Sequence, residues 1–86
     1  MAYSMNNRDE IFDTLCDVLV EMFEADRADI SMEARLYEDL DIDSIDAIDL
    51  VVKVKDITGK RVKPEDFKAV RTVGDVVIAI ERLLGI

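Results

Sequence analysis

Apolar residues recur every three or four positions in three segments of this chain, and that spacing most limits the folds open to it. Residues three and four apart share one face of a helix, so the pattern predicts amphipathic α-helices. The first segment, residues 8–23, carries two adjacent apolar stripes: Ile11, Leu15, Val18 and Met22, and beside them Phe12, Cys16, Leu19 and Phe23. Such a wide apolar band needs other helices to cover it.

The second segment begins after Asp43, a residue type suited to cap a helix N-terminus. Asp46 follows three positions later, as in a capping box, and Gly59 suits the left-handed residue that ends a helix. A short strand over residues 50–54 is the competing local prediction, because the β-branched valines there lower helix propensity. The lack of turn signals and of other strand candidates favours the helix.

The third segment begins at a second capping box, formed by Thr72 and Asp75, and Gly85 closes it. Its inward residues are expected to be Val76, Val77, Ile80, Leu83 and Leu84. Between the second and third segments, residues 62–67 predict a short helix with Pro64 in its first turn, where no hydrogen-bond donor is lost.

Residues 24–29 end the first helix, and the long connection that follows, to about residue 43, is too apolar for a loose linker, so we expect it to pack on the helices. Its apolar residues are Ile30, Met32, Leu36, Tyr37, Leu40 and Ile42. The sequence therefore predicts an all-α fold: a four-helix bundle of three long helices and one short helix, with a long loop between helices 1 and 2. A single domain, residues 8–86, would follow a flexible N-terminus, residues 1–7.

The net charge of −9 is spread unevenly along the chain. Residues 9–49 contain 15 acidic and 2 basic residues, whereas residues 50–86 contain 5 acidic and 8 basic ones. This balance argues against a nucleic-acid partner and favours basic protein surfaces. No apolar run approaches the roughly 20 residues of a membrane span. Residues 1–7 do not resemble a signal peptide, so we expect a cytoplasmic location.

The side chains that catalysis or metal binding needs are poorly placed here. The chain has no histidine, and Lys53 and Lys55 lie more than two helical turns from Ser44, so no base can activate that hydroxyl. Residues 39–43 match the opening of a calcium-binding EF-hand loop, but Ser44 and Leu50 occupy the positions of its glycine and its bidentate glutamate. The lone Cys16 reads as a buried thiol. We expect neither an enzyme nor a metal site.

Ser44 is instead a candidate for modification by another enzyme. It follows the cap of the second helix, where backbone N–H groups favour a phosphate group. Nearby carboxylates would attract a basic modifying enzyme, and Ile45 and Ile48 would give that enzyme an apolar contact. The alternative is an ordinary exposed serine at a helix start.

The stretch from Leu36 to Leu50 resembles the signature of acyl carrier proteins, whose centre is Asp-Ser-Leu followed by an acidic residue. Here the centre reads Asp43-Ser44-Ile45-Asp46. The resemblance extends to length, acidity, the long first loop and the helix order. It implies that Ser44 receives a 4′-phosphopantetheine arm from coenzyme A through a magnesium-dependent phosphopantetheinyl transferase. The thiol of the arm would carry acyl groups as thioesters to acyl-transfer and synthase enzymes of fatty-acid or related lipid and polyketide synthesis.

The resemblance also implies a surface for docking partners along the second helix. Its charges would come from Asp43, Asp46 and Asp49, and its apolar part from Ile45, Ile48 and Val52, whose alternative role is core packing. Core packing is the preferred interpretation for Leu50, Val51, Val54 and Ile57.

One departure from the family pattern lies farther along the second helix, which becomes basic at Lys53 and Lys55 and continues to Lys60-Arg61. This change suggests a specialised carrier with its own partners, and the alternative is a drifted general carrier. An aminoacyl, D-alanyl or polyketide carrier, and a helical adaptor without a prosthetic group, also remain open. A monomer would suit a shuttle.

Overall fold

The computed structural model describes residues 6–62, 67 and 69–85. Within these residues the elements are α1 (Arg8–Phe23), the 3₁₀ turn η1 (Arg27–Asp29), α2 (Ser44–Thr58) and α3 (Val73–Leu84), and there is no strand. The predicted all-helical class is confirmed for this part of the chain. The competing strand over residues 50–54 is wrong, because those residues lie inside α2. Residues 63–66 of the predicted short helix and residues 1–5 of the predicted N-terminal segment lie outside the described residues.

The ends of α2 and α3 follow the predicted capping signals. The Asp43 carboxylate accepts a hydrogen bond from the Asp46 backbone N–H, and the Asp46 side chain in turn accepts from the Asp43 N–H. Thr72 and Asp75 make the same reciprocal pair at α3. Gly59 ends α2 with φ of 66°, in the left-handed region that side chains disfavour.

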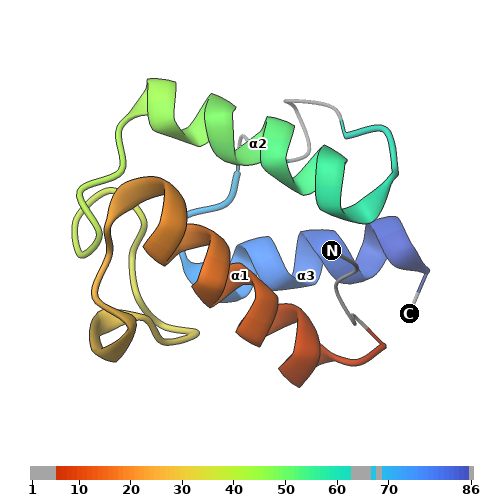
Figure 1. Ribbon diagram of the computed structural model, residues 1–86, viewed down its shortest axis with the longest axis horizontal. Coiled ribbons are helices and arrows are strands. Elements are labelled where there is room, and N and C mark those ends of the chain that lie inside the picture. Colours follow the sequence, from red (N-terminus) through yellow and green to blue (C-terminus); the bar gives the residue numbers. More distant parts are fainter. Residues whose placement is uncertain (1–5, 63–66, 68, 86) are drawn as a thin grey trace.

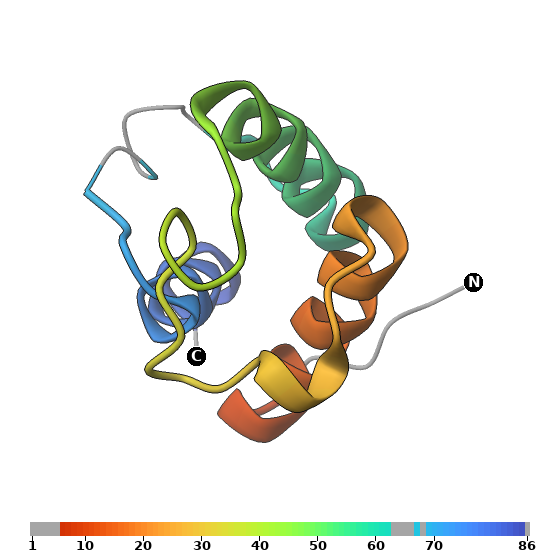
Figure 2. The ribbon, with the colours of Figure 1, turned by 90° about the vertical axis from the view of Figure 1, so that its left-hand side faces the viewer.

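The three helices enclose one apolar core. α1 packs chiefly against α3, and α2 also contacts α3. Figures 1 and 2 show the three helices arranged around a common centre. The side chains with 2% exposure or less, which form the centre of this core, are Ile11, Leu15, Cys16, Val18, Leu19, Leu36, Ile42, Leu50, Val54, Val73, Val76, Val77 and Ile80. No helix in the described part of the chain is both long and apolar enough to cross a membrane.

The long loop between α1 and α2 crosses one end of the three helices (Figure 2). Three backbone hydrogen bonds of 2.9 Å tie it to the start of α3: Leu36 N–H to Arg71 O, Val73 N–H to Ala34 O, and Gly74 N–H to Met32 O. Ile30, Leu36 and Ile42 are buried, as predicted for an apolar loop. The prediction is wrong for Tyr37, which is 47% exposed. The loop is thus held against α3 along its course to α2.

Candidate functional site

Ser44 is the first residue of α2 and is exposed to solvent. Asp43, just before it, is in extended conformation, so the chain turns into the helix at this serine. The first backbone N–H groups of a helix have no acceptor within the helix, and they favour a negative group placed there. The Ser44 hydroxyl is therefore accessible at the positive end of a helix dipole.

The two carboxylates beside Ser44 hold the helix start in place. The Asp43 carboxylate accepts from the Asp46 N–H at 2.9 Å, and the Asp46 carboxylate accepts from the Asp43 N–H at 3.4 Å. Asp43 is exposed and Asp46 is half-buried, while Asp49 lies exposed one turn farther along. The same acidic residues thus shape the backbone at Ser44 and give its surroundings a negative charge.

Three aliphatic side chains of α2 lie on the surface near Ser44. The exposed fractions of Ile45, Ile48 and Val52 are 72%, 61% and 53%, the largest among the big apolar side chains described as exposed. Core packing, the alternative role for these three, is excluded by their exposure. Leu50 and Val54 are buried and Val51 and Ile57 half-buried, as expected for the core side of α2.

A cavity of about 500 Å³ opens beside Ser44. Its described lining is mainly apolar and comes from α2, the long loop and the chain after α2: Tyr37, Ser44, Ala47, Ile48, Val51, Val52, Lys55, Val62 and Phe67. The sequence did not predict that Tyr37, Lys55, Val62 and Phe67 would gather here. Only Lys55 carried a signal, since it lies three helical turns from Ser44 and therefore on the same face.

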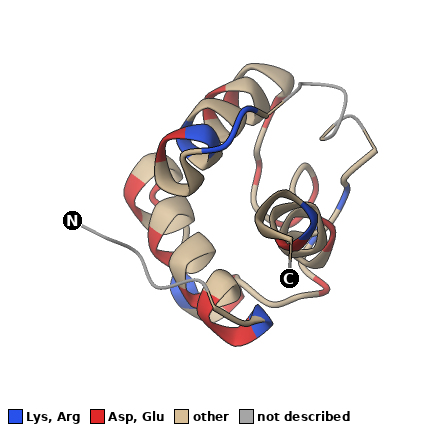
Figure 3. Cartoon of the chain, turned by 90° about the vertical axis from the view of Figure 1, so that its right-hand side faces the viewer, with Lys and Arg blue, Asp and Glu red and all other residues tan. Residues whose placement is uncertain are grey.

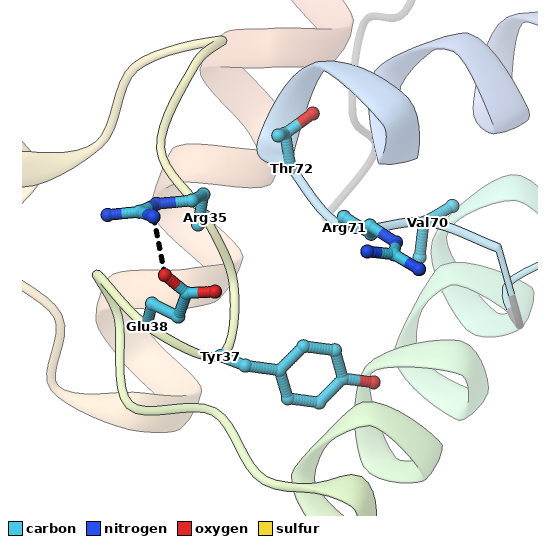
Figure 4. A pocket seen from close by; sticks show the side chains of 6 residues that line it. All are labelled: Arg35, Tyr37, Glu38, Val70, Arg71 and Thr72. Carbon is cyan, nitrogen blue, oxygen red and sulfur yellow. Dashed lines mark ion pairs between the residues drawn. The ribbon is translucent and has the colours of Figure 1, made fainter.

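Tyr37 also lines a second cavity, of about 420 Å³. Figure 4 shows Tyr37 extending toward α2, with Arg71 across the space and Arg35 paired with Glu38 at its edge. Arg35 also binds Asp39, and the side-chain hydrogen bond from Arg35 lowers the pKa of the Asp39 carboxyl below its usual range. Asp39, the first residue of the EF-hand-like stretch, therefore stabilises the loop through Arg35.

The described residues hold no group of three or more His, Cys, Asp or Glu side chains placed to bind a metal ion. Arg35, at the loop's turn, is engaged by Glu38 and Asp39. Near Ser44 the described cavity lining offers no carboxylate and, apart from Lys55, no basic side chain. What this site presents is an accessible hydroxyl, an apolar surface and a surrounding negative charge.

The comparisons with known proteins agree with that arrangement. Residues 13–80 match the family described as "Phosphopantetheine attachment site". The chain is 51% identical over 76 residues to "Acyl carrier protein 2" of Ralstonia nicotianae, covering 88% of this chain and 94% of that protein. It is 37% identical to "Acyl carrier protein" of Thermotoga maritima, covering 94% of this chain and all of that one.

A third relative is the "Meromycolate extension acyl carrier protein" of Mycolicibacterium smegmatis, 33% identical over 88% of this chain and 77% of that protein. The family match spans most of the chain, and the carriers align with it almost from end to end. This chain belongs to the acyl carrier proteins, which are not enzymes themselves and bear a covalently attached 4′-phosphopantetheine group.

Proposed function

We propose that Ser44 is the residue to which the 4′-phosphopantetheine group is attached. The observation that carries this proposal is the position of the serine: it is exposed, it is the first residue of α2, and it lies inside the region that matches the family. Ser31 is also exposed, but it lies in the long loop and is not the first residue of a helix. The local sequence Asp43-Ser44-Ile45-Asp46 adds to the case.

The residues around Ser44 fit the attached group. A phosphodiester on the hydroxyl would lie at the N-terminus of α2, where helix N–H groups favour negative charge. The apolar cavity beside Ser44 gives a flexible arm and its cargo a surface to rest on. The group supplies a thiol that holds acyl cargo as a thioester, and the residues of this chain position it and present it to other enzymes.

Intact mass tests the assignment directly. The apo protein is incubated with coenzyme A, magnesium and a broad-specificity phosphopantetheinyl transferase. The wild type is expected to gain the mass of one arm, and Ser44→Ala is expected to gain none. Ser31→Ala, a matched change of an exposed serine, is expected to gain the arm normally. An arm on Ser44→Ala, or an unmodified wild type, contradicts the assignment.

We further propose that the outer face of α2 is where partner enzymes bind. Ile45, Ile48 and Val52 provide exposed apolar area at its centre. Asp43, Asp46 and Asp49 provide negative charge for the transferase and for synthases with basic docking surfaces. Exposed aliphatic side chains surrounded by charge are the usual composition of a protein interface.

Matched isoleucine variants test this face. Ile48→Ala is expected to lower kcat/KM of the transferase by roughly tenfold, which corresponds to about 1.4 kcal/mol. The control is Ile78→Ala, which removes a 40% exposed isoleucine from α3. Its kcat/KM is expected to change little, and equal effects of the two variants would remove the support for a docking face on α2.

Finer features are proposals of the same kind. We propose a short fourth helix at residues 62–67, supported by Pro64 in its first turn and by the burial of Phe67.

We propose a specialised role in fatty-acid or related lipid and polyketide synthesis, because basic residues follow the acidic start of α2. Equal elongation on this protein and on the organism's main carrier by the housekeeping ketosynthase would contradict that role. A monomeric state and a cytoplasmic location, which ultracentrifugation and cell fractionation test, complete the proposal.

A further inference from the structure

Lys55 stands at the far end of the surface that surrounds Ser44. The two residues are 11 positions apart, which is three helical turns and about 16 Å along α2. They therefore lie on the same side of the helix, and both line the cavity of about 500 Å³. Ile48 and Val52, two of the exposed aliphatic residues, lie between them.

On α2, no acidic residue lies three or four positions from Lys55, the spacing at which side chains of one helix meet, and the adjacent Asp56 points to another side. The residues three and four positions away on either side are Val51, Val52, Thr58 and Gly59. Among the described residues the ion pairs are made by Arg8, Arg27 and Arg35, and none involves Lys55. The described lining of the cavity contains no carboxylate either.

Lys53, the other lysine of α2, differs from Lys55 because acidic residues lie close to it on the helix. It is half-buried, and Asp49 and Asp56 lie four positions before it and three after it, so acidic neighbours share its side of α2. Asp49 and Asp56 are both exposed and are seven positions apart, so they form one acidic edge of the outer face. Lys55 lies on the opposite edge, beside the cavity. Figure 3 shows basic residues at the end of α2 and just after it, where acidic residues also occur.

We propose that the enzymes this carrier serves present a carboxylate opposite Lys55, beside the entrance through which they receive the arm. The inference rests on the proposed role of Ser44 and the outer face of α2. An enzyme that takes cargo from Ser44 and covers Ile48 and Val52 must also cover Lys55. Burying an unpaired ammonium costs several kcal/mol, so a partner without an acidic residue at that point binds poorly.

The acidic edge of α2 and the edge that carries Lys55 are then expected to contact partner residues of opposite charge. Basic residues of the partner meet Asp49 and Asp56, and an acidic residue meets Lys55. This pattern fixes one orientation of α2 on the partner and rejects an enzyme whose docking surface is basic throughout. Lys55 is a specificity-determining residue of the docking surface and takes no part in the chemistry of transfer.

Charge variants of the holo protein test the inference with two enzymes. One is a housekeeping fatty-acid ketosynthase chosen for a basic docking surface. The other is whichever acyl-transfer or synthase enzyme of the source organism has the highest kcat/KM for the wild type. Lys55→Glu is expected to lower kcat/KM of the preferred enzyme about tenfold, mainly through KM, and to raise that of the housekeeping enzyme severalfold.

Two further variants control the comparison. Lys55→Arg keeps the charge and is expected to restore most of the rate with the preferred enzyme. Arg82→Glu makes the same charge change at an exposed residue of α3, outside the docking face of α2, and is expected to alter either kcat/KM less than threefold. Effects of the same sign on both enzymes, or none above twofold, overturn the inference.

The test of Lys55 can be separated from the test of Ser44 as the attachment residue. Mass spectrometry first shows whether each variant carries the arm on Ser44. A missing arm on the wild type contradicts the role of Ser44, whereas arm-bearing variants with unchanged partner preference contradict only the role of Lys55. Circular dichroism of each variant confirms that the helices are retained.

Discussion

At the scale of single residues, Cys16 shows how burial decides the chemistry of a side chain. It is 1% exposed and lies within the core face of α1. Burial raises the pKa of its thiol, and Asp13 and Asp17 add to the rise while Arg27 opposes it. Because the thiolate is the reactive form, we expect a native protein whose cysteine resists alkylation.

Alkylation kinetics measure this protection. Iodoacetamide is expected to modify Cys16 slowly in native buffer and rapidly in concentrated urea, with the adduct followed by intact mass. Cys16→Ala keeps the site apolar and is expected to cost about 1–2 kcal/mol of unfolding free energy. Cys16→Ser places an unpaired hydroxyl there and is expected to cost more. Rapid labelling of the folded apo protein would contradict a buried thiol.

At the scale of elements, Gly74 allows the long loop to lie against the start of α3. A Cβ at this position would stand 2.9 Å from the Met32 carbonyl oxygen, which already accepts the Gly74 N–H hydrogen bond. Gly74→Ala is therefore expected to push the loop away and lower the unfolding free energy by about 1–3 kcal/mol. Urea unfolding measures the loss, and amide shifts of Ala34 and Leu36 report the displaced loop.

Gly59→Ala is the matched control for that substitution. Gly59 has the opposite constraint: its backbone is left-handed, with φ of 66°, but no atom lies within 4 Å of an added Cβ. Gly59→Ala is expected to lower the unfolding free energy by about 1–2 kcal/mol through backbone strain alone. The amide shifts of the loop are expected to stay unchanged. Unshifted loop amides in Gly74→Ala as well would mean that the contact with Met32 is not tight.

The second prediction for elements concerns the charge at the start of α3. The backbone N–H of Arg71 donates to the Asp75 carboxylate, and with the Thr72 contacts it lowers the pKa of that carboxyl from the usual 3.8. A carboxyl whose pKa is lower in the folded state stabilises the fold above its unfolded pKa. That stabilisation is lost as the pH falls through the folded pKa.

Asp75→Asn is therefore expected to cost about 1 kcal/mol at neutral pH. The difference from wild type should begin to shrink as the pH falls below 3.8, where the carboxyl of the unfolded chain takes up a proton, and it should be lost once the pH passes below the folded pKa. Urea unfolding at several pH values measures both effects, and Glu33→Gln, an exposed acid in the loop, provides the charge control. A cost that stays constant down to the most acidic conditions would assign the effect to shape and not to charge.

At the scale of the whole molecule, the sequence predicted the features that depend on neighbouring residues, such as the starts of α2 and α3. The helix limits followed from Asp43 with Asp46 and from Thr72 with Asp75, because a cap needs only neighbouring residues. The exposure of Tyr37 could not be predicted, because it depends on how the loop is tied to α3.

The same reasoning applies to the candidate site. The motif and the helix start singled out Ser44, and the face that Ile45, Ile48 and Val52 share follows from their spacing. Whether that face was core or surface depended on tertiary packing, as did the approach of Val62 and Phe67 to the cavity. Caps and helix faces were therefore predictable from neighbours in sequence, whereas the exposure of Tyr37 and the lining of the cavity depend on segments far apart in the chain.

The final prediction concerns the charge of the entire protein. With a net charge of −9 concentrated in residues 9–49, the apo carrier should be steered toward a basic enzyme through solvent. Salt screens such steering, because the Debye length falls from about 10 Å at 0.1 M to about 3 Å at 1 M. We expect kcat/KM of the phosphopantetheinyl transferase to fall severalfold between about 0.05 and 0.5 M NaCl, with kcat nearly constant.

Asp49→Asn and Asp29→Asn test whether the salt dependence of kcat/KM comes from charge on the docking face of α2 or from the total charge of the protein. Both remove one exposed carboxylate, but Asp49 lies on α2 and Asp29 on η1 at the loop. Asp49→Asn is expected to lower the low-salt kcat/KM more and to flatten its salt dependence, since nearby charges dominate the final approach. If the two variants behave alike, only the total charge of the protein guides the encounter, and α2 makes no special electrostatic contribution.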